Sequence, residues 1–258
     1  MKQGVIVLHE ARHNPQGRFD GLGSVYAKYR PDYPATAIDW IVETLPPAGL
    51  IADVGAGTGI LSRQLAQRGL RVIGIEPNAS MRQEAKQAMS DGIEYRAGNA
   101  EATGLDPSSV DGVVAAQAFH WFDREAALRE FHSILRPGGS ASILWNTADE
   151  DDPCTAAFWK IMQSTTPEPE VVREPHDWTG RILLDHLLFE NAVCRVTFHE
   201  QALDEEGLLG RAFSASFAPK ECQASERFAV RLRAMFREHS SDGIVRLRYR
   251  TTVYQARR

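Results

Sequence analysis

Short apolar runs alternate with amphipathic stretches between residues 50 and 146. Runs of a few apolar residues are typical of strands buried on both faces, and they occur at 50–54, 71–75, 93–97, 110–116 and 141–145. Apolar residues at helical spacing occupy 58–68, 78–89 and 123–135, with Asn78 and Asp123 as predicted N-caps. Strands separated by helices predict an α/β fold with a doubly wound parallel sheet.

The remaining residues predict further elements in a less regular order. Strands are predicted at 192–198 and 244–254, and helices at 35–45, 156–163, 181–189, 204–216 and 225–237. The acidic stretch 149–152 marks the point where the regular alternation ends. We therefore interpret 19–258 as a single domain in which 147–190 is an insertion on the substrate side. Residues 1–18 show no periodicity and predict a flexible N-terminal tail.

Composition excludes several classes of function. The net charge of −5 disfavours a nucleic-acid partner, and we expect the alternating Arg246, Arg248 and Arg250 to form a solvated strand face. The three cysteines have no metal-ligand spacing, so we expect no metal and mostly buried free thiols. The chain has no apolar run that could span a membrane and no signal-peptide pattern, so we expect a cytoplasmic protein without a membrane partner.

A glycine-rich turn lies between the first predicted strand and its helix. Gly55-Ala56-Gly57-Thr58-Gly59 allows a sharp turn and a close approach of the backbone to a ligand. The N–H groups at the start of the helix add hydrogen-bond donors and a partial positive charge. Glu76 ends the second strand, where a carboxylate can accept hydrogen bonds from both hydroxyls of a ribose. Together these residues predict a ligand that contains adenosine.

Two residues favour S-adenosylmethionine over NAD as that ligand. The dinucleotide fingerprint GxGxxG has a third glycine, but Ile60 follows the pattern GxGxG here. Asp53 places a negative charge beside the glycines, which would repel a pyrophosphate and attract the cationic ammonium or sulfonium of S-adenosylmethionine.

These motifs resemble those of class I S-adenosylmethionine-dependent methyltransferases, in the broad small-molecule group called methyltransferase type 11. The similar segments cover roughly residues 20–146 and are 53–59, 75–78 with Met81, 98–101, 115–122 and 136–139. The resemblance implies a Rossmann-like sheet of seven strands in the order 3-2-1-4-5-7-6, mostly parallel, with the last strand antiparallel. The aromatic and proline-rich residues from Tyr26 to Pro34 look like part of an N-terminal lid, which we place at 19–46.

The resemblance also implies roles for single residues. The backbone of the glycine loop would face the methionine part of S-adenosylmethionine, and Glu76 would hold the ribose. Residues at the ends of the later strands would contact the adenine and the sulfonium. The lid would add Tyr26 and Arg30. The predicted cofactor residues are Tyr26, Arg30, Asp53, Gly55, Ala56, Gly57, Glu76, Pro77, Met81, Asn99, Ala100, Gln117 and Ala118. The product of methyl transfer would be S-adenosylhomocysteine.

Methyl transfer is a direct displacement for which alignment of the reactants can suffice. His120 is the candidate for a general base, and the alternative is that it only shapes the pocket. Tyr33, Trp121 and Trp145 join His120 as predicted contacts of the methyl acceptor. We expect transfer to an N, O or S atom of a small apolar or aromatic molecule, by a monomer or homodimer.

Two other functions remain open at this point. A non-catalytic protein that binds S-adenosylmethionine would have the same motifs. An NAD(P)-dependent oxidoreductase is disfavoured by Ile60 and by the lack of a recognisable Ser/Tyr/Lys catalytic set.

Overall fold

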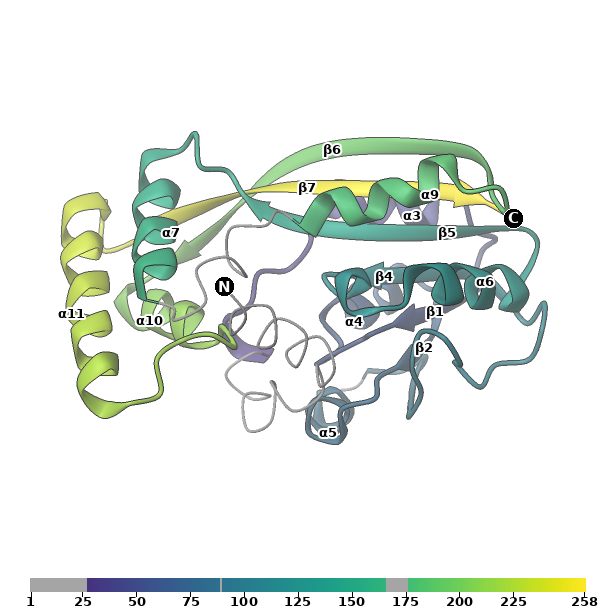
Figure 1. The fold of residues 1–258 in the computed structure, drawn as a ribbon, viewed down its shortest axis with the longest axis horizontal. Helices are drawn as coiled ribbons and strands as arrows, with labels where there is room; N and C mark the ends of the chain where they lie inside the picture. The colour runs from purple at the N-terminus through teal and green to yellow at the C-terminus, as the bar shows by residue number, and fades with distance from the viewer. Residues whose placement is uncertain (1–26, 89, 166–175) are drawn as a thin grey trace, which may run out of the picture.

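The computed structural model describes residues 27–88, 90–165 and 176–258, and a seven-stranded sheet runs through its length (Figure 1). The strand order is β3-β2-β1-β4-β5-β7-β6. β7 pairs antiparallel with β5 and with β6, and the pairings among the first five strands are parallel. The predicted fold class and strand order are therefore confirmed. The strands are β1 (Leu50–Val54), β2 (Arg71–Ile75), β3 (Ile93–Arg96), β4 (Val110–Ala116), β5 (Leu135–Ala148), β6 (Glu190–Leu203) and β7 (Val245–Arg257).

Helices cover both faces of the sheet. α3 (Ala35–Val42) and α4 (Ile60–Ala66) pack on one face in a core cluster that includes Ile38 and Leu65. α6 (Arg124–Ile134) and α9 (Ile182–Asp185), with the 3-10 helix η3 (His176–Arg181), lie on the other. α5 (Ala79–Gln87) packs beside β3. Both predicted N-caps are confirmed, because Asn78 accepts a hydrogen bond from the N–H of Met81 and Asp123 from that of Ala126.

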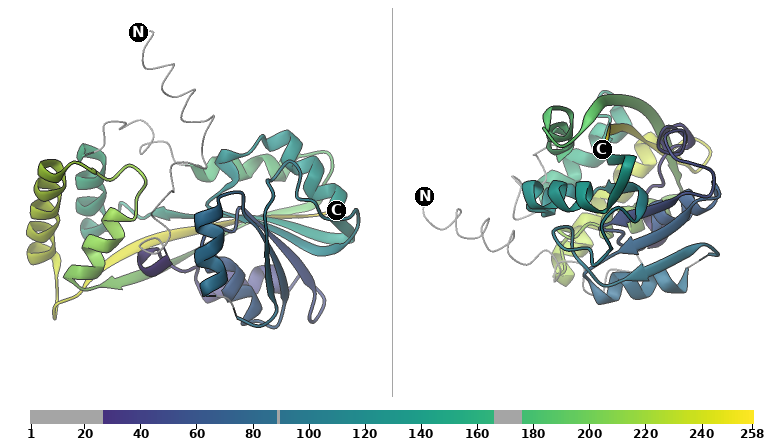
Figure 2. Two further views of the ribbon diagram at one scale, coloured as in Figure 1. Left: turned by 90° about the horizontal axis from the view of Figure 1, so that it is seen from below. Right: turned by 90° about the vertical axis from the view of Figure 1, so that its right-hand side faces the viewer.

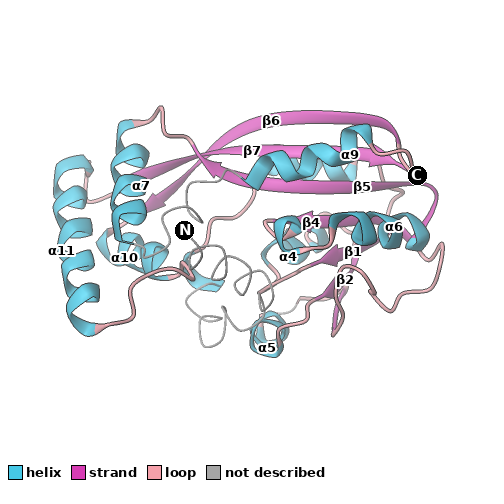
Figure 3. Cartoon of the chain, viewed as in Figure 1, coloured by secondary structure: helices cyan, strands magenta, loops and turns pink. Residues whose placement is uncertain are grey.

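The last three strands extend beyond the rest of the sheet and carry a helical lobe at one end (Figures 1 and 2). This helical lobe consists of α7 (Pro153–Thr165), α10 (Glu205–Phe213) and α11 (Cys222–His239), coloured as helices at the left of Figure 3. It has an apolar core of its own, to which Phe158, Leu208 and Leu232 contribute. Within its described residues, the predicted insertion 147–190 thus supplies α7 to this lobe, and η3 and α9 to one face of the sheet.

Burial alternates along the extended part of β7. Val245, Leu247 and Tyr249 are buried in the core of the helical lobe, whereas Arg246, Arg248 and Arg250 are exposed. The three arginines therefore share one face, as the period of two predicts.

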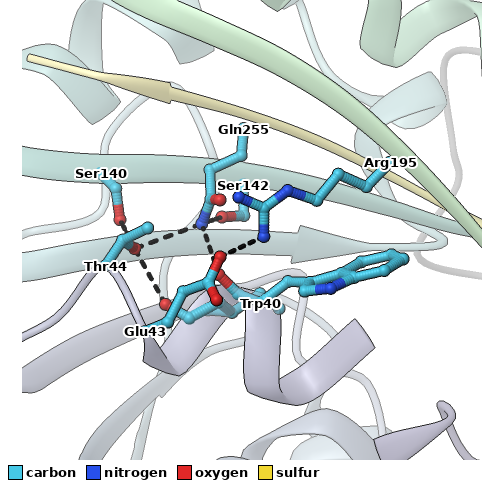
Figure 4. A network of polar contacts seen from close by, with 8 residues as sticks. Trp40, Glu43, Thr44, Ser140, Ser142, Arg195 and Gln255 are labelled. Atoms are coloured by element: carbon cyan, nitrogen blue, oxygen red, sulfur yellow. Dashed lines mark hydrogen bonds and ion pairs between the residues drawn. The ribbon is translucent and has the colours of Figure 1, made fainter. Parts of the chain in front are cut away.

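α3 is tied to the sheet by polar contacts at its carboxyl end (Figure 4). The side-chain amide of Gln255 donates to the carbonyl of Trp40 and to the hydroxyls of Thr44 and Ser142. Arg195 of β6 forms an ion pair with Glu43. The part of the predicted lid that forms α3 therefore belongs to the layer that covers the sheet.

Two further expectations concern the surface. Cys194 and Cys222 are exposed, so the expectation of mostly buried thiols is wrong for these two, because they lie on an edge strand and in the first turn of a helix. Among the described residues, we find no helix with the length and apolar character needed to cross a membrane.

Candidate active site

A cleft of about 220 Å³ opens at the carboxyl ends of β1, β2 and β4. Ligands of open α/β sheets bind at this edge, where neighbouring connections diverge to opposite faces. Most of the predicted cofactor residues line the cleft. The lining consists of Gly55, Gly57, Glu76, Pro77, Asn78, Met81, Asn99, Ala100, Glu101, Ala116, Gln117, Ala118, Trp121 and Phe122.

The glycine loop is held in a conformation that favours glycine. Gly55, Gly57 and Gly59 have φ angles of 74°, 56° and 77°. A Cβ on Gly55 would lie 2.6 Å from the Cβ of Ala118, so this glycine lets the two walls of the cleft meet. A Cβ on Gly57 would have no other atom within 4 Å. The space in front of Gly57 is therefore free to hold a ligand.

Glu76 is fixed against the glycine loop. Its two carboxylate oxygens accept hydrogen bonds from the N–H of Gly57 and of Asn78, both at 2.8 Å. The residue is only 7% exposed, and burial raises the pKa of its carboxyl although these backbone N–H groups oppose the rise. Each oxygen keeps a second lone pair. Glu76 can therefore accept two more hydrogen bonds from hydroxyl groups in the cleft.

Asp53 lies behind the loop and does not line the cleft. It is 1% exposed, and its Oδ2 accepts a hydrogen bond of 2.6 Å from the hydroxyl of Ser62 in α4. Burial raises the pKa of Asp53 to about 6. The structure thus corrects the expectation of a direct cofactor contact, because the side chain points between β1 and α4. Its charge can act on a ligand only through the loop.

Gln117 directly follows β4 and has a backbone conformation that is unusual for a residue other than glycine. Its φ angle is 56°, which costs a non-glycine residue roughly 1 kcal/mol or more. Its N–H donates to the carbonyl of Leu144 and its side-chain amide to that of Asn146, at 3.0 and 2.8 Å. These two bonds to β5 hold Gln117 at the wall of the cleft.

The opposite end of the cleft has mixed polar and apolar walls. Met81 is 3% exposed and Ala100 2% exposed, so both present only a small apolar surface. The carboxamide oxygen of Asn99 accepts a hydrogen bond of 2.8 Å from the N–H of Ala102. The amide nitrogen of Asn99 is therefore the end that can donate to a ligand.

Aromatic residues close the side next to β4. Trp121 and Phe122 line the cleft, and the ring of His120 lies 4.4 Å from that of Trp121 and 5.3 Å from that of Trp145. Trp145 is 2% exposed within the core, so it cannot offer a face to an acceptor as predicted. His120 is half-buried beside Trp121 and is not part of the lining.

The predicted lid residues lie away from the cleft or outside the described part of the chain. Tyr26 is outside the described residues. Arg30 donates to the carbonyl of Ser214 in the helical lobe at 3.1 Å. Tyr33 is 8% exposed, and its backbone N–H and carbonyl both bond to the side chain of Gln64. Ala56 turns within the glycine loop without lining the cleft.

In the described part of the chain, four lining residues were not predicted as site residues: Asn78, Glu101, Ala116 and Phe122. The sequence predicts Asn78 as an N-cap, and it predicts Asn99 and Ala100, the two residues before Glu101, as cofactor contacts. Among the described residues, no group of histidine, cysteine and carboxylate side chains could hold a metal ion.

The cleft falls within a region that known proteins share. A family model described as a methyltransferase domain matches residues 52–143. An uncharacterised methyltransferase of Mycobacterium tuberculosis is 36% identical over 174 residues, which are 63% of this chain and 70% of that protein. An uncharacterised methyltransferase-like protein of Schizosaccharomyces pombe is 34% identical over 140 residues, 53% of this chain and 54% of its own length.

The folds agree over a longer stretch. A solved structure from Anaeromyxobacter dehalogenans, proposed to be a type II methyltransferase, matches with a TM-score of 0.66 and 25% identity. The match covers 89% of this chain and 98% of that one. The chain belongs to the class I S-adenosylmethionine-dependent methyltransferases. The cleft of this methyltransferase lies within the residues that the family model matches, whereas its helical lobe lies outside them.

Proposed function

We propose that this methyltransferase binds S-adenosylmethionine in the cleft and transfers its methyl group to an N, O or S atom of a small, apolar or aromatic molecule. The observation that carries the proposal is the pairing of Glu76 with Gly57. A buried carboxylate with spare lone pairs stands beside a glycine that faces open space. That arrangement suits a ligand whose ribose diol binds Glu76 while the part next to the ribose approaches the backbone of Gly57.

The two ends of the cleft suit the other parts of the same molecule. The amide nitrogen of Asn99 can donate to a ring nitrogen of adenine, while Met81 and Ala100 supply apolar contacts. At the other end, the amide nitrogen of Gln117 is bonded to Asn146, which leaves its oxygen to accept from the ammonium group of methionine.

The side of Trp121 and Phe122 is where we place the acceptor. The sulfonium of S-adenosylmethionine, when bound, supplies an activated methyl group. Aromatic side chains there would exclude water, favour a planar or apolar acceptor and stabilise positive charge. The protein would then act mainly by alignment, which can supply on the order of 7–11 kcal/mol of barrier reduction.

The test is calorimetric titration with S-adenosylhomocysteine of the wild type, Glu76→Gln and Glu101→Gln. The control carboxylate of Glu101 also lines the cleft but accepts from the N–H of Asp123. We expect Glu76→Gln to weaken binding at least tenfold, because it loses the charge and an acceptor for the diol, and Glu101→Gln to weaken it less than threefold. Equal affinity of wild type and Glu76→Gln, with circular dichroism unchanged, would remove Glu76 from the site.

A further inference from the structure

Residues 27–34, here called the strap, run from the helical lobe to α3. At this end, the hydroxyl of Tyr29 donates to Glu206 of the lobe at 2.8 Å, and the backbone carbonyl of Tyr29 accepts from Gln201 of β6 at 2.9 Å. The ring of Tyr29 also packs against Gly210, where a Cβ would lie 2.4 Å from the ring. At the other end, the backbone of Tyr33 is paired with Gln64 of α4, the helix that follows the glycine loop.

Asn146, near the end of β5, holds the middle of the strap. Its amide nitrogen donates to the carbonyl of Asp32 at 3.1 Å. Its amide oxygen accepts from the hydroxyl of Thr251 at 2.7 Å. Its backbone carbonyl accepts from the side chain of Gln117 at 2.8 Å. One residue therefore contacts the strap, the neighbouring strand β7 and the wall of the cleft.

The network behind Asn146 fixes the orientation of its carboxamide. The hydroxyl of Thr251 donates to Asn146, and its oxygen also lies 3.2 Å from Nδ1 of His199. The ring of His199 is stacked on that of Tyr249 at 5.3 Å, which limits its rotation. The oxygen of the Asn146 carboxamide is thus directed at β7, and its nitrogen at the strap.

We propose that Asn146 is a positioning residue that couples the strap to the cofactor-binding wall of the cleft. Its side chain holds the strap while its carbonyl sets the orientation of the Gln117 carboxamide, whose oxygen faces the methionine part of the cofactor. This inference rests on the proposed function. It predicts that an occupied cleft and an ordered strap stabilise each other, because both depend on the position of the same residue.

Asn146→Asp separates the coupling from the fold. The aspartate keeps the oxygen that Thr251 needs and the carbonyl that Gln117 needs, but it replaces the donor to Asp32 by an oxygen. The matched control is Thr147→Val on the next position of β5. That hydroxyl donates to the carbonyl of Arg250, outside the network.

The experiment uses the full chain and two measurements with S-adenosylhomocysteine: its dissociation rate, and hydrogen exchange of the strap with and without it. We expect the ligand to slow exchange of residues 28–33 in the wild type and in Thr147→Val. In Asn146→Asp the strap should exchange rapidly with or without ligand, and the ligand should dissociate about five to twenty times faster. If that variant does not fold, Thr251→Val removes the support of the Asn146 oxygen and should show the same change to a smaller degree.

Two results would overturn the coupling. In the first, the strap of Asn146→Asp exchanges rapidly but the ligand dissociates at the wild-type rate, which would make Asn146 a structural residue only. In the second, the ligand protects the strap equally in both proteins. A wild type that does not bind S-adenosylhomocysteine would instead refute the proposed function, and the coupling with it.

Discussion

The buried carboxylate of Asp53 should make the fold less stable as the pH rises. Its pKa is raised to about 6 in the folded protein, against 3.8 in an unfolded chain, and the cause is burial between β1 and α4. Between these two values the folded state binds more protons than the unfolded state, so stability falls with rising pH. A shift of about two units corresponds to roughly 3 kcal/mol, lost by the time the pH exceeds 6.

Asp53→Asn should remove most of this loss while keeping the shape of the side chain. The hydroxyl of Ser62 can still donate to the amide oxygen. We expect the variant to gain on the order of 1–3 kcal/mol over the wild type at pH 8, and little at pH 4. The affinity for S-adenosylmethionine should fall more than that for S-adenosylhomocysteine, because only the former has the sulfonium charge that the carboxylate attracts.

Urea unfolding of both proteins at pH values from 4 to 8 measures the first effect, and calorimetry with both ligands at pH 8 the second. The difference in unfolding free energy should grow through pH 5 and 6 and then level off. A variant less stable than the wild type at pH 8, or a difference independent of pH, would refute the reasoning. Either result would show that the charge of the Asp53 carboxylate does not destabilise the fold.

Three further outcomes follow from the structure. Gly59→Ala should destabilise the fold by more than Gly57→Ala, for which we expect roughly 1 kcal/mol of backbone strain, because a Cβ at position 59 would lie 2.0 Å from the Tyr95 hydroxyl. Thermal unfolding of the two variants measures the difference. Asp111→Asn should lower stability at pH 7 and not below pH 3. Burial raises the pKa of Asp111, but Arg136 and the N–H of Leu50 outweigh it and lower the pKa overall; urea unfolding at both pH values checks this. His120→Ala should slow methyl transfer less than tenfold with an unchanged rate–pH profile, because the ring does not line the cleft. Loss of a titration step from the profile would identify His120 as a general base.

Strands inside the sheet could be predicted from the sequence more closely than those that leave it. The bounds of β1, β2 and β4 agree with the apolar runs, because strands buried on both faces are continuously apolar. β5 and β6 are longer than predicted: β5 already begins at Leu135, and β6 continues to Leu203, which is buried in the core of the helical lobe. The contact of that lobe with distant strands has no local signal.

The candidate site divides in the same way. Gly55, Gly57 and Glu76 could be located because the turn and the strand end that place them are local features. The inward direction of Trp145 depends on how β5 lies between β4 and β7, and the direction of Asp53 on the approach of Ser62. Neither tertiary contact can be deduced from spacing along the chain. The same holds for Asn146, whose partners come from three separate segments.

Titration of the wild-type chain with S-adenosylhomocysteine and with NADH tests the central claim most directly. Both ligands contain an adenosine ribose that Glu76 could hold, but only NADH contains a pyrophosphate, which Asp53 and Glu76 would repel. The account predicts saturable binding of S-adenosylhomocysteine at one site, displaced by S-adenosylmethionine, and no measurable binding of NADH. Saturable binding of NADH without binding of S-adenosylhomocysteine would contradict it.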